Sequence, residues 1–588
     1  MIRDWNRETD TGAIHALGNG NIVVYGFGPE ITQTLAYPIS ADSFCQILLP
    51  EEMRCRSERL DGTAIWRHNM ENGDVITDYI DTEINCFVRQ VVCTEGRQML
   101  LKVDAPYRFV KCEDDIWYFD TPNGVEFFYH HVDITPRRYI KVSGAAKIQQ
   151  VEDDSFLLTF GEGVGSLYFS DTPEALLEEE KQDVDMVLAR IGAYWGDFLK
   201  QMKPFPKWLA ELAENVGIMI KCQQAHDGSV LAGHHYHLAY VRDQYGVGRG
   251  LMAMGFYREV EALMGYYKMY FDQYGVIHNA QSMGHHGVFH IHENDNVEVT
   301  GYLVIQAFQI YEHNHSEQFL KDMMPMIRWA IDTQIGEMRD GMLPFSGDET
   351  YIAGLFLPRF AMYDGSSEAT MLLAESLRLY EKHTGDTRYN AVLQEIRDTY
   401  LKNFIRNGRL MTNIPERTPL SDYPAGRHGM CEDCGRCKGE LKRNENYRYI
   451  CQYCADHPVL PPRPFGSIEL AAPKLMHLYI GSDLVPAEMM NGYLNEMVES
   501  FERDGKMPSG CADGNAVGYD YGLFLYALAK VGHPAAKKIR DLTLSVLDET
   551  GAWCEYYQNG KPWNTRCRPW ESAMNMEGLI AYYKEFGD

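Results

Sequence analysis

A chain of 588 residues is too long for one ordinary hydrophobic core and predicts two or more domains. With 45% hydrophobic and 23% charged residues, its composition is that of a water-soluble globular protein. The formal net charge of -28 argues against nucleic acids and anionic membrane surfaces as partners.

The ends and the cysteines favour a cytoplasmic location. The N-terminal segment lacks the apolar core of a secretory signal, and no apolar run reaches the ~18 residues of a membrane-spanning helix. Of the 14 cysteines, five lie between Cys431 and Cys454, and the others are scattered. This pattern is typical of reduced thiols plus one metal site. We expect no membrane partner, and the sequence leaves a homo-oligomer open.

The first 172 residues predict an antiparallel β-sandwich. Short apolar runs alternate with stretches that contain Gly, Asp and Asn, a pattern typical of many short strands. Residues 94–97, Thr-Glu-Gly-Arg, separate two of these runs and predict a hairpin turn. Residues 173–203, rich in Glu, Leu and Ala, predict a helical linker. The strand-like runs are residues 21–27, 84–93, 98–103, 127–132, 139–142, 155–160 and 166–169.

From residue 204 to residue 588 the apolar pattern has the period of helices. Apolar residues within 369–380 fall on one helix face, and Thr384-Gly385-Asp386 predicts the end of that helix. Similar glycine-containing breaks lie at 480–483 and 531–534. The repeat of helix, short turn and helix predicts about a dozen paired helices in one large all-α domain.

Glu555 is an acidic residue set among aromatic rings and arginines, in the segment Gly-Ala-Trp-Cys-Glu-Tyr-Tyr that begins at Gly551. Aromatic faces are platforms for the apolar C–H faces of sugar rings, and a carboxylate between them can deprotonate a water or bind hydroxyls. The alternative is a partly buried glutamate that pairs with Arg566 or Arg568.

Arg242 and Asp243 form a second polar motif, directly after Tyr240. An arginine can donate hydrogen bonds to sugar hydroxyls and an aspartate can accept them, so the pair suits a sugar with two free hydroxyls. The alternative is a surface ion pair. The pattern places this motif just ahead of a helix over residues 248–254.

These motifs together resemble the glucoamylase family of inverting glycosidases (family 15-type), which belongs to the six-hairpin glycosidase superfamily. The aromatic-x-Arg-Asp motif of that family is matched by Tyr240 to Asp243. Its catalytic glutamate, followed by a Trp-Ser-x-Ala type segment, is matched by Glu555 and residues 570–573 with one residue inserted. Residues 294–301 are similar to a helix start of the family, and residues 17–20 and 35–38 are similar to the opening of the β-sandwich in its bacterial members.

The resemblance implies an N-terminal β-sandwich followed by an (α/α)6 barrel, with hydrolysis by a general acid and a general base. In inverting enzymes the two carboxyl groups stand roughly 6.5–9.5 Å apart, with a water between the base and the sugar. Glu555 matches the base. The resemblance further implies that Tyr240, Arg242, Asp243 and Asp348 contact the sugar, and that Trp570 forms a wall of the site. No cofactor is expected for catalysis.

The general acid of the family precedes a Gly-Ser-Ser element at the start of a helix. We assign this role to Glu349, which lies upstream of Gly365-Ser366-Ser367, and keep Asp348 and Glu368 as alternatives. The sequence departs from the family pattern here in two ways. No tryptophan precedes Glu349, and the insertion of residues 351–363 separates it from the Ser-Ser element.

Residues 425–460 predict a zinc-ribbon-like insertion within the helical domain. Cys431 and Cys434, followed by glycine, form one Cys-x-x-Cys pair, and Cys451 and Cys454 form the second. Four thiolates in this arrangement suit tetrahedral Zn²⁺ with a structural role. Cys437 leaves the first pair ambiguous, because Cys434 and Cys437 have the same spacing.

The sequence therefore predicts an inverting glycoside hydrolase that releases a terminal sugar, glucose by the resemblance, from a small α-linked oligosaccharide. Two other functions remain open. A disaccharide phosphorylase of the same architecture would use phosphate in place of water and would need no base. A non-catalytic carbohydrate-binding relative would bind sugar without turnover.

Overall fold

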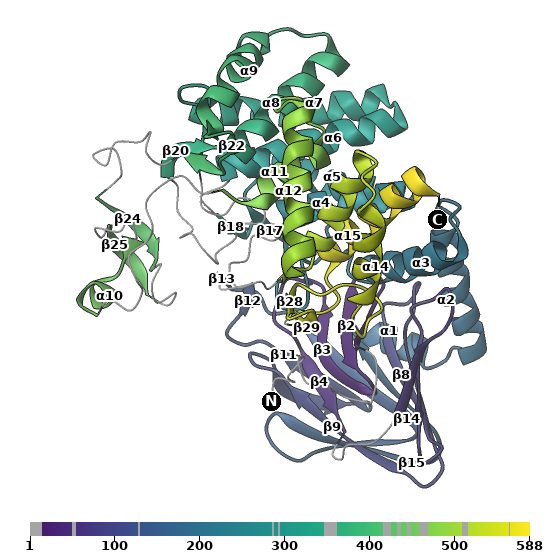
Figure 1. Ribbon diagram of the computed structural model, residues 1–588. Coiled ribbons are helices and arrows are strands. Elements are labelled where there is room, and N and C mark those ends of the chain that lie inside the picture. Colours follow the sequence, from purple (N-terminus) through teal and green to yellow (C-terminus); the bar gives the residue numbers. More distant parts are fainter. Residues whose placement is uncertain are drawn as a thin grey trace.

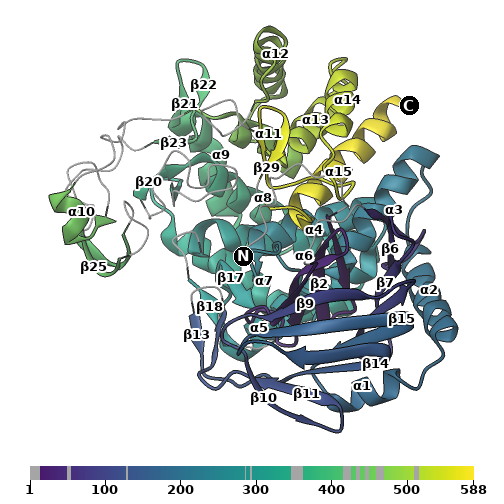
Figure 2. The ribbon, with the colours of Figure 1, turned by 90° about the horizontal axis from the view of Figure 1, so that it is seen from below.

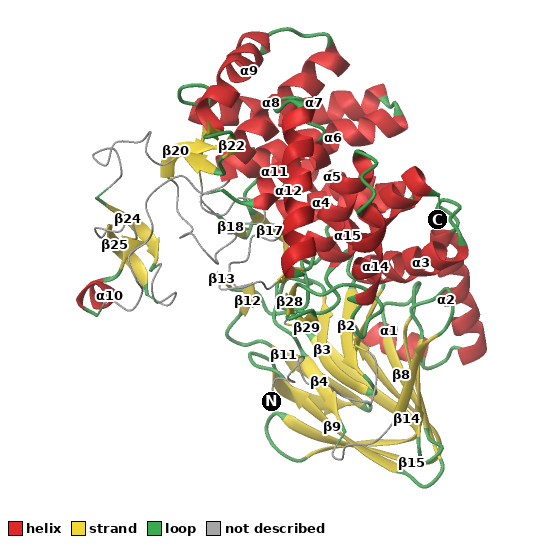
Figure 3. Ribbon diagram, viewed as in Figure 1, coloured by secondary structure: helices red, strands yellow, loops and turns green. Residues whose placement is uncertain are grey.

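The structure is a computed structural model that describes residues 14–49, 55–127, 130–284, 287–291, 295–345, 362–414, 425–431, 437–443, 449–457, 469–508, 516–563 and 565–587. Strands gather in one half of the molecule and helices in the other (Figure 3). The strand-rich half comes from the N-terminal part of the chain, coloured purple to blue in Figure 1. In the described residues, none of the helices has both the length and the apolar character needed to cross a membrane.

The N-terminal strands form one antiparallel sheet of 13 strands within the described residues. Its order is β1-β2-β3-β4-β9-β15-β8-β7-β6-β5, and β14, β11 and β10 extend it from β15. The sheet curls round a core in which Phe44 packs against Phe119 and Phe169, so the predicted β-sandwich is confirmed. The strands are β1 (Ile14–Gly18), β2 (Ile22–Phe27), β3 (Glu30–Ala36), β4 (Cys45–Leu48), β5 (Cys55–Arg59), β6 (Trp66–Met70), β7 (Val75–Ile80), β8 (Phe87–Cys93), β9 (Arg97–Val103), β10 (Arg108–Glu113), β11 (Ile116–Asp120), β14 (Arg138–Gln150) and β15 (Ser155–Ser170), beside a separate hairpin of β12 (Val125–Phe127) and β13 (His130–Val132).

Strand β15 lies in the middle of this sheet, between β9 and β8. Its pairing shows that two predictions were wrong. Along one edge it pairs with β14, and along the other it pairs with β9 over residues 155–160 and with β8 over residues 163–169. β8 and β9 therefore lie end to end, and the predicted hairpin at residues 94–97 is wrong. The two strands predicted at 155–160 and 166–169 are one strand. The glycines between them mark a bend in a continuous strand rather than a reversal of the chain.

Six helices form the inner ring of the helical domain within the described residues. They contact one another in the closed order α4-α6-α8-α11-α13-α15-α4. Each packs against at least one helix of an outer layer, so the predicted (α/α)6 barrel is confirmed. The inner helices are α4 (Val241–Met254), α6 (Thr300–Asn314), α8 (Ser367–Thr384), α11 (Ala471–Ile480), α13 (Asp520–Lys530) and α15 (Pro569–Phe586), and the outer helices are α3 (Lys207–Cys222), α5 (Tyr257–Tyr274), α7 (Glu317–Glu337), α9 (Asn390–Phe404), α12 (Ala487–Asp504) and α14 (Ala536–Ser545).

Adjacent inner helices run parallel. On α4 and α15, Arg242 lies beside Trp570 at the N-terminal ends, and Arg249 bonds Glu577 seven residues further along each helix. The N-terminal ends of the ring therefore face one side. The strands and short helices that connect the other elements are α1 (Pro173–Glu179), α2 (Val184–Leu199), β16 (Leu238–Tyr240), β17 (Ala280–Ser282), β18 (Phe289–His290), the π-helix η1 (Asp295–Val299), β19 (Leu343–Phe345), β20 (Met362–Ser366), β21 (Ile405–Arg406), β22 (Arg409–Leu410), β23 (Asn413–Ile414), β27 (Ala516–Val517), β28 (Tyr556–Gln558) and β29 (Lys561–Trp563).

Helix α4 begins at Val241, seven residues before the predicted start at Gly248. The prediction was wrong because glycines at 246, 248 and 250 lower the helix propensity of this segment. Their role is close packing: a Cβ atom at Gly246 would collide with the ring of Trp570, and one at Gly250 would collide with Ala573. Tertiary contact with α15 thus outweighs local propensity.

The insertion is a three-stranded antiparallel sheet with one short helix, and it lies outside the ring of helices in both views (Figures 1 and 2). Strands β24 and β25 pair along their whole length, and β26 adds to β25. The elements are β24 (Gly426–Met430), β25 (Lys438–Arg443), β26 (Tyr449–Ile450) and α10 (Gln452–Asp456).

Candidate active site at the N-terminal ends of the inner helices

Arg242 and Asp243 lie in the first turn of α4, at the N-terminal end of the ring. Tyr240 precedes the helix in an extended conformation and ends strand β16. Asp243 is only 6% exposed, and the side chain of Arg242 is 11% exposed. The two side chains bond different partners, so the motif is not a surface ion pair.

Arg568 connects the two helix starts that carry the predicted site. Its guanidinium donates to both carboxylate oxygens of Glu571, at 2.8 and 2.9 Å, and to Oδ1 of Asp243 at 3.3 Å. It also donates to the backbone carbonyl of Ala232. Arg568 is 4% exposed, so these bonds form away from solvent. The arginine therefore fixes Asp243 of α4 against the first turn of α15.

The cluster holds more carboxyl groups than cations. Glu555, Asp243 and Glu571 surround the single guanidinium of Arg568. Burial raises the pKa of Glu571 to about 7; the charges of Glu555 and Asp243 act in the same direction, and Arg568 opposes them. Glu571 therefore takes up a proton near neutral pH, which reduces the repulsion among the three groups.

Replacing Glu571 with glutamine should change how stability depends on pH. A carboxyl whose pKa is raised on folding stabilises the fold fully below its unfolded pKa, and this contribution is lost as the pH rises through about 7. Glutamine resembles the protonated acid and does not titrate. We expect the free energy of unfolding, measured in urea from about pH 5 to about pH 8, to fall less for Glu571→Gln than for the unchanged protein. Parallel curves would contradict the assignment.

Glu555, the predicted base, lies in the segment that precedes β28. Its backbone N–H donates to the carbonyl of Thr565, and its carbonyl accepts from Gly518, so the residue is fixed between two loops at the mouth of the ring. The side chain is 6% exposed and is hydrogen-bonded by Tyr236. Burial, followed by the charge of Glu555, raises the pKa of that phenol, so Tyr236 remains the proton donor in this bond.

The two arginines considered as ion-pair partners of Glu555 bond other carboxylates. Arg566 bonds Glu549 at 3.1 Å and approaches Asp548 at 3.8 Å, while Arg568 bonds Glu571 and Asp243. Tyr236 donates a hydrogen bond to Glu555, and the positive charge of Arg568 interacts with it as well.

Trp570 forms a wall beside these groups. Its ring lies in the recess left by Gly246, 4.7 Å from the ring of Tyr519. The guanidinium of Arg242 lies over the indole, 5.7 Å from its centroid, and its Nη1 is 3.7 Å from Glu298. The fully buried Glu298 belongs to the π-helix before α6. Arg242 is therefore oriented by an aromatic face and a carboxylate.

The predicted acid, Glu349, and its neighbour Asp348 lie outside the described residues. The alternative Glu368 is described: it lies in the first turn of α8 and accepts a hydrogen bond from the hydroxyl of Tyr302 at 3.0 Å. It is buried, and in the order of the ring α8 is opposite α15. β19 and β20, which flank residues 346–361, pair with each other, and β20 runs into α8. The chain on both sides of Glu349 thus lies across the ring from Glu555.

Sequence reasoning missed four polar residues that complete this site: Arg568 as a connector, and Glu571, Tyr236 and Glu298. The signal was weak. Glu571 was visible as an acid directly after Trp570, at the start of a helix whose buried residues are mostly apolar. The partner of Glu571 and Asp243 could not be read from the sequence, because Arg568 and Asp243 are 325 residues apart.

Three of the predicted metal ligands lie together in the insertion. The thiols of Cys431, Cys451 and Cys454 are all within 4.8 Å of one another. Cys434 lies outside the described residues. Cys437 is exposed and lies outside this group of three, although its thiol contacts that of Cys451. Cys431 thus keeps its place in the cluster.

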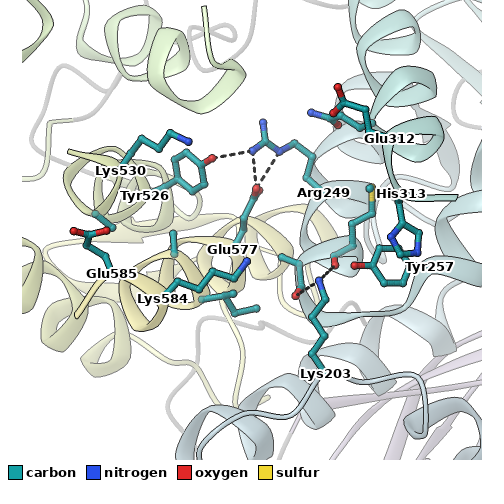
Figure 4. Close-up of a pocket in the computed structure, with 16 residues that line it drawn as sticks. Lys203, Arg249, Tyr257, Glu312, His313, Tyr526, Lys530, Glu577, Lys584 and Glu585 are labelled. Atoms are coloured by element: carbon teal, nitrogen blue, oxygen red, sulfur yellow. Dashed lines mark hydrogen bonds and ion pairs between the residues drawn. The ribbon is translucent and has the colours of Figure 1, made fainter. Parts of the chain in front are cut away.

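A cavity of about 710 Å³ lies at the other end of the inner helices (Figure 4). Its lining includes Arg249, Met252 and Ala253 of α4, some ten residues or about 15 Å beyond Arg242 along the helix. Lys203 donates there to the carbonyls of Met252 and Ala253, which offsets the partial negative charge of the helix C-terminus. The cavity is therefore separate from the predicted sugar site.

Comparisons with known proteins identify the fold. No protein-family model and no curated protein sequence matches the chain. Among solved structures, the chain is similar to a bacterial glucoamylase in complex with acarbose, with a TM-score of 0.62 and 11% identity over 100% of this chain and 99% of the other. It is also similar to a human-microbiome protein assigned as a kojibiose phosphorylase, with a TM-score of 0.57 and 10% identity over 97% and 86%.

A third similar structure is a family GH92 α-mannosidase from Bacteroides thetaiotaomicron, with a TM-score of 0.51 and 9% identity over 97% of this chain and 82% of the other. At these identities the likeness concerns the arrangement of the chain. In the described residues of this chain, that arrangement is a curled antiparallel sheet followed by six inner and six outer helices. The chain therefore shares its fold with these glycosidase and phosphorylase structures.

Proposed function

We propose that the protein is an inverting glycoside hydrolase that removes a terminal sugar from a small α-linked oligosaccharide. The observation that carries this proposal is the setting of Glu555. Its carboxylate accepts a hydrogen bond from Tyr236 and interacts with the charge of Arg568, which precedes Trp570 and helix α15. An acceptor of this kind, next to an aromatic platform and sugar-binding groups, suits the activation of a water.

The two halves of the reaction come from opposite sides of the ring. Glu555 takes a proton from a water, whose oxygen attacks the anomeric carbon as the bond to the leaving oxygen breaks. Glu349 donates a proton to that leaving oxygen. Its place in the chain, between β19 and the start of α8, supports this role, and Glu368 is the described alternative. After each turnover the base returns its proton to solvent and the acid regains one.

The terminal sugar binds against α4 and α15 in this proposal. Arg242 donates to one hydroxyl and Asp243 accepts from another, while the face of Trp570 covers the apolar side of the ring. Arg568 and Glu298 hold the first two side chains in place. Glucose is the terminal sugar that the glucoamylase resemblance favours, and the acarbose-bound glucoamylase of similar fold is consistent with this choice.

The product of the first turnovers tests the mechanism. We expect free sugar from α-linked disaccharides, among them maltose, kojibiose and trehalose, at the same rate with and without phosphate. Inversion predicts that NMR detects the β-anomer first. This readout applies to the sugar cleaved from the non-reducing end of maltose or kojibiose, because the leaving glucose of trehalose is itself the α-anomer. Release of the non-reducing-end sugar as the α-anomer would contradict inversion.

The same assay separates the rival functions. A strict need for phosphate, with a sugar 1-phosphate as the product, would identify a phosphorylase, whose similar fold keeps this option open. Sugar binding without turnover across the panel would identify a non-catalytic relative. Either result would overturn the hydrolase proposal.

A further inference from the structure

The insertion brings cysteines from two segments to one point. Cys431 follows strand β24, Cys451 follows β26, and Cys454 lies on α10. Their sulfur atoms are all within 4.8 Å of one another. Cys431 and Cys454 are buried, at 1% and 3% exposure. Unrelated thiols would not be expected to gather in the interior of so small a unit. Convergence of three thiols is the arrangement that a metal ion needs.

Backbone N–H groups point at these sulfur atoms. The N–H of Cys451 donates to Sγ of Cys431 at 3.3 Å, and the N–H of Cys454 donates to the thiol of Cys451. A donor aimed at sulfur suits the thiolate, which is the form of cysteine that binds metals. The second bond spans a Cys-x-x-Cys segment, so the turn itself prepares the ligand pair.

Few apolar side chains are buried in the part of the insertion that the structure describes. In its described residues, the buried apolar side chains other than cysteine are Leu441, Tyr449 and Ile450. None of the three joins the main cluster of the helical domain. Units of this size are stable when a metal or disulfides replace the missing core. The sheet of β24, β25 and β26 therefore needs a cross-link at its cysteine end.

A second group of metal-binding residue types does not share these properties. His15, His68 and Asp78 also approach one another, inside the β-sandwich. Asp78 is already bonded through both oxygens by the buried Arg89, at 2.8 and 2.6 Å. That guanidinium occupies the carboxylate and repels a cation. Cys451, by contrast, contacts the other cysteines of the insertion: Cys431, Cys437 and Cys454.

We propose that Cys431, Cys451 and Cys454 bind a structural Zn²⁺ ion that holds the insertion together. A structural zinc site has four protein ligands, and three sulfur atoms leave one position for a fourth thiolate. The remaining cysteines of the insertion, Cys434 and Cys437, lie between Cys431 and β25 in the sequence. The site is independent of the proposed hydrolysis, since it lies outside the ring that carries Glu555.

Metal analysis of the purified full-length protein tests the proposal. We expect inductively coupled plasma mass spectrometry to find about one zinc ion per chain. Cys451→Ser and Cys454→Ser should each lose most of this zinc, whereas Cys112→Ser, which removes an exposed thiol of β10, should keep it. Zinc absent both after purification and after titration of the reduced protein would overturn the proposal. So would bound iron, or a mass that shows a disulfide among these cysteines.

Two further measurements locate the fourth ligand and guard against misfolding. A tetrathiolate site requires that either Cys434→Ser or Cys437→Ser also loses zinc, and full retention in both would contradict it. Loss of zinc should expose residues 425–457 to limited proteolysis while the main unfolding transition stays unchanged, because these residues are outside the barrel core. Collapse of the whole protein in Cys454→Ser would overturn the description of an independent metal-held unit.

Discussion

Replacement of Glu555 by glutamine is expected to lower kcat on an α-linked disaccharide by about 100- to 10,000-fold, the range for loss of a general base. Glutamine has the size of glutamate and still accepts the bond from Tyr236, but it does not take a proton from water. The measurement is the rate of sugar release, with the unfolding midpoint recorded beside it.

The fold should tolerate this change. Removing one of three carboxylates around Arg568 relieves repulsion with Asp243 and Glu571, so we expect equal or higher stability. Glu549→Gln is the matched control. Glu549 lies in the segment just before Glu555, is exposed and bonds Arg566. Unchanged turnover in Glu555→Gln would show that Glu555 is not the base. Loss of turnover in both variants would point to an effect on folding.

Replacement of Arg568 by methionine should have the largest effect on stability. Methionine fills much of the space but leaves Asp243 and Glu571 buried without their shared cation. Removing one partner of a buried ion pair costs about 3–5 kcal/mol. We expect a loss of that size in the free energy of unfolding from urea titration. Sugar binding should fail too, because Arg568 positions Asp243.

A second substitution separates lost charge from lost packing. In Arg568→Met/Glu571→Leu one of the two stranded carboxylates is also gone, so part of the stability should return. Arg568→Lys keeps the positive charge but cannot donate two parallel hydrogen bonds to Glu571. Its free energy of unfolding should lie between those of the unchanged protein and Arg568→Met. If Arg568→Met unfolds at the same urea concentration as the unchanged protein, the cluster is not a determinant of stability.

The sequence predicted the architecture well because periodicity reports on burial. Residues 369–380 showed one apolar face, and α8 does end at Thr384 with Gly385 in a left-handed conformation. Prediction from the sequence failed where the same local pattern fits two different structures. Gly96, with its positive φ of 101°, reads as a hairpin turn, yet here it continues one strand into the next along β15. Only the distant pairing partner decides between the two.

The candidate site could also be predicted from the sequence only in part. Glu555, Arg242 and Asp243 could be selected from the sequence, because their residue types and neighbours suit sugar chemistry. Their mutual arrangement could not, because it depends on Arg568, which reaches Asp243 across 325 residues. The roles of Glu349 and Asp348 remain predictions, since both lie outside the described residues.

The ring of inner helices closes between its first member, α4, and its last, α15. This has a consequence for biosynthesis. Asp243 leaves the ribosome more than three hundred residues before Arg568, and until α15 docks, its carboxylate and the glycine-lined face of α4 have no partner. Contacts between such distant segments form late in folding. A nascent chain therefore carries an incomplete barrel, and the proposed sugar site is incomplete as well until α15 has docked.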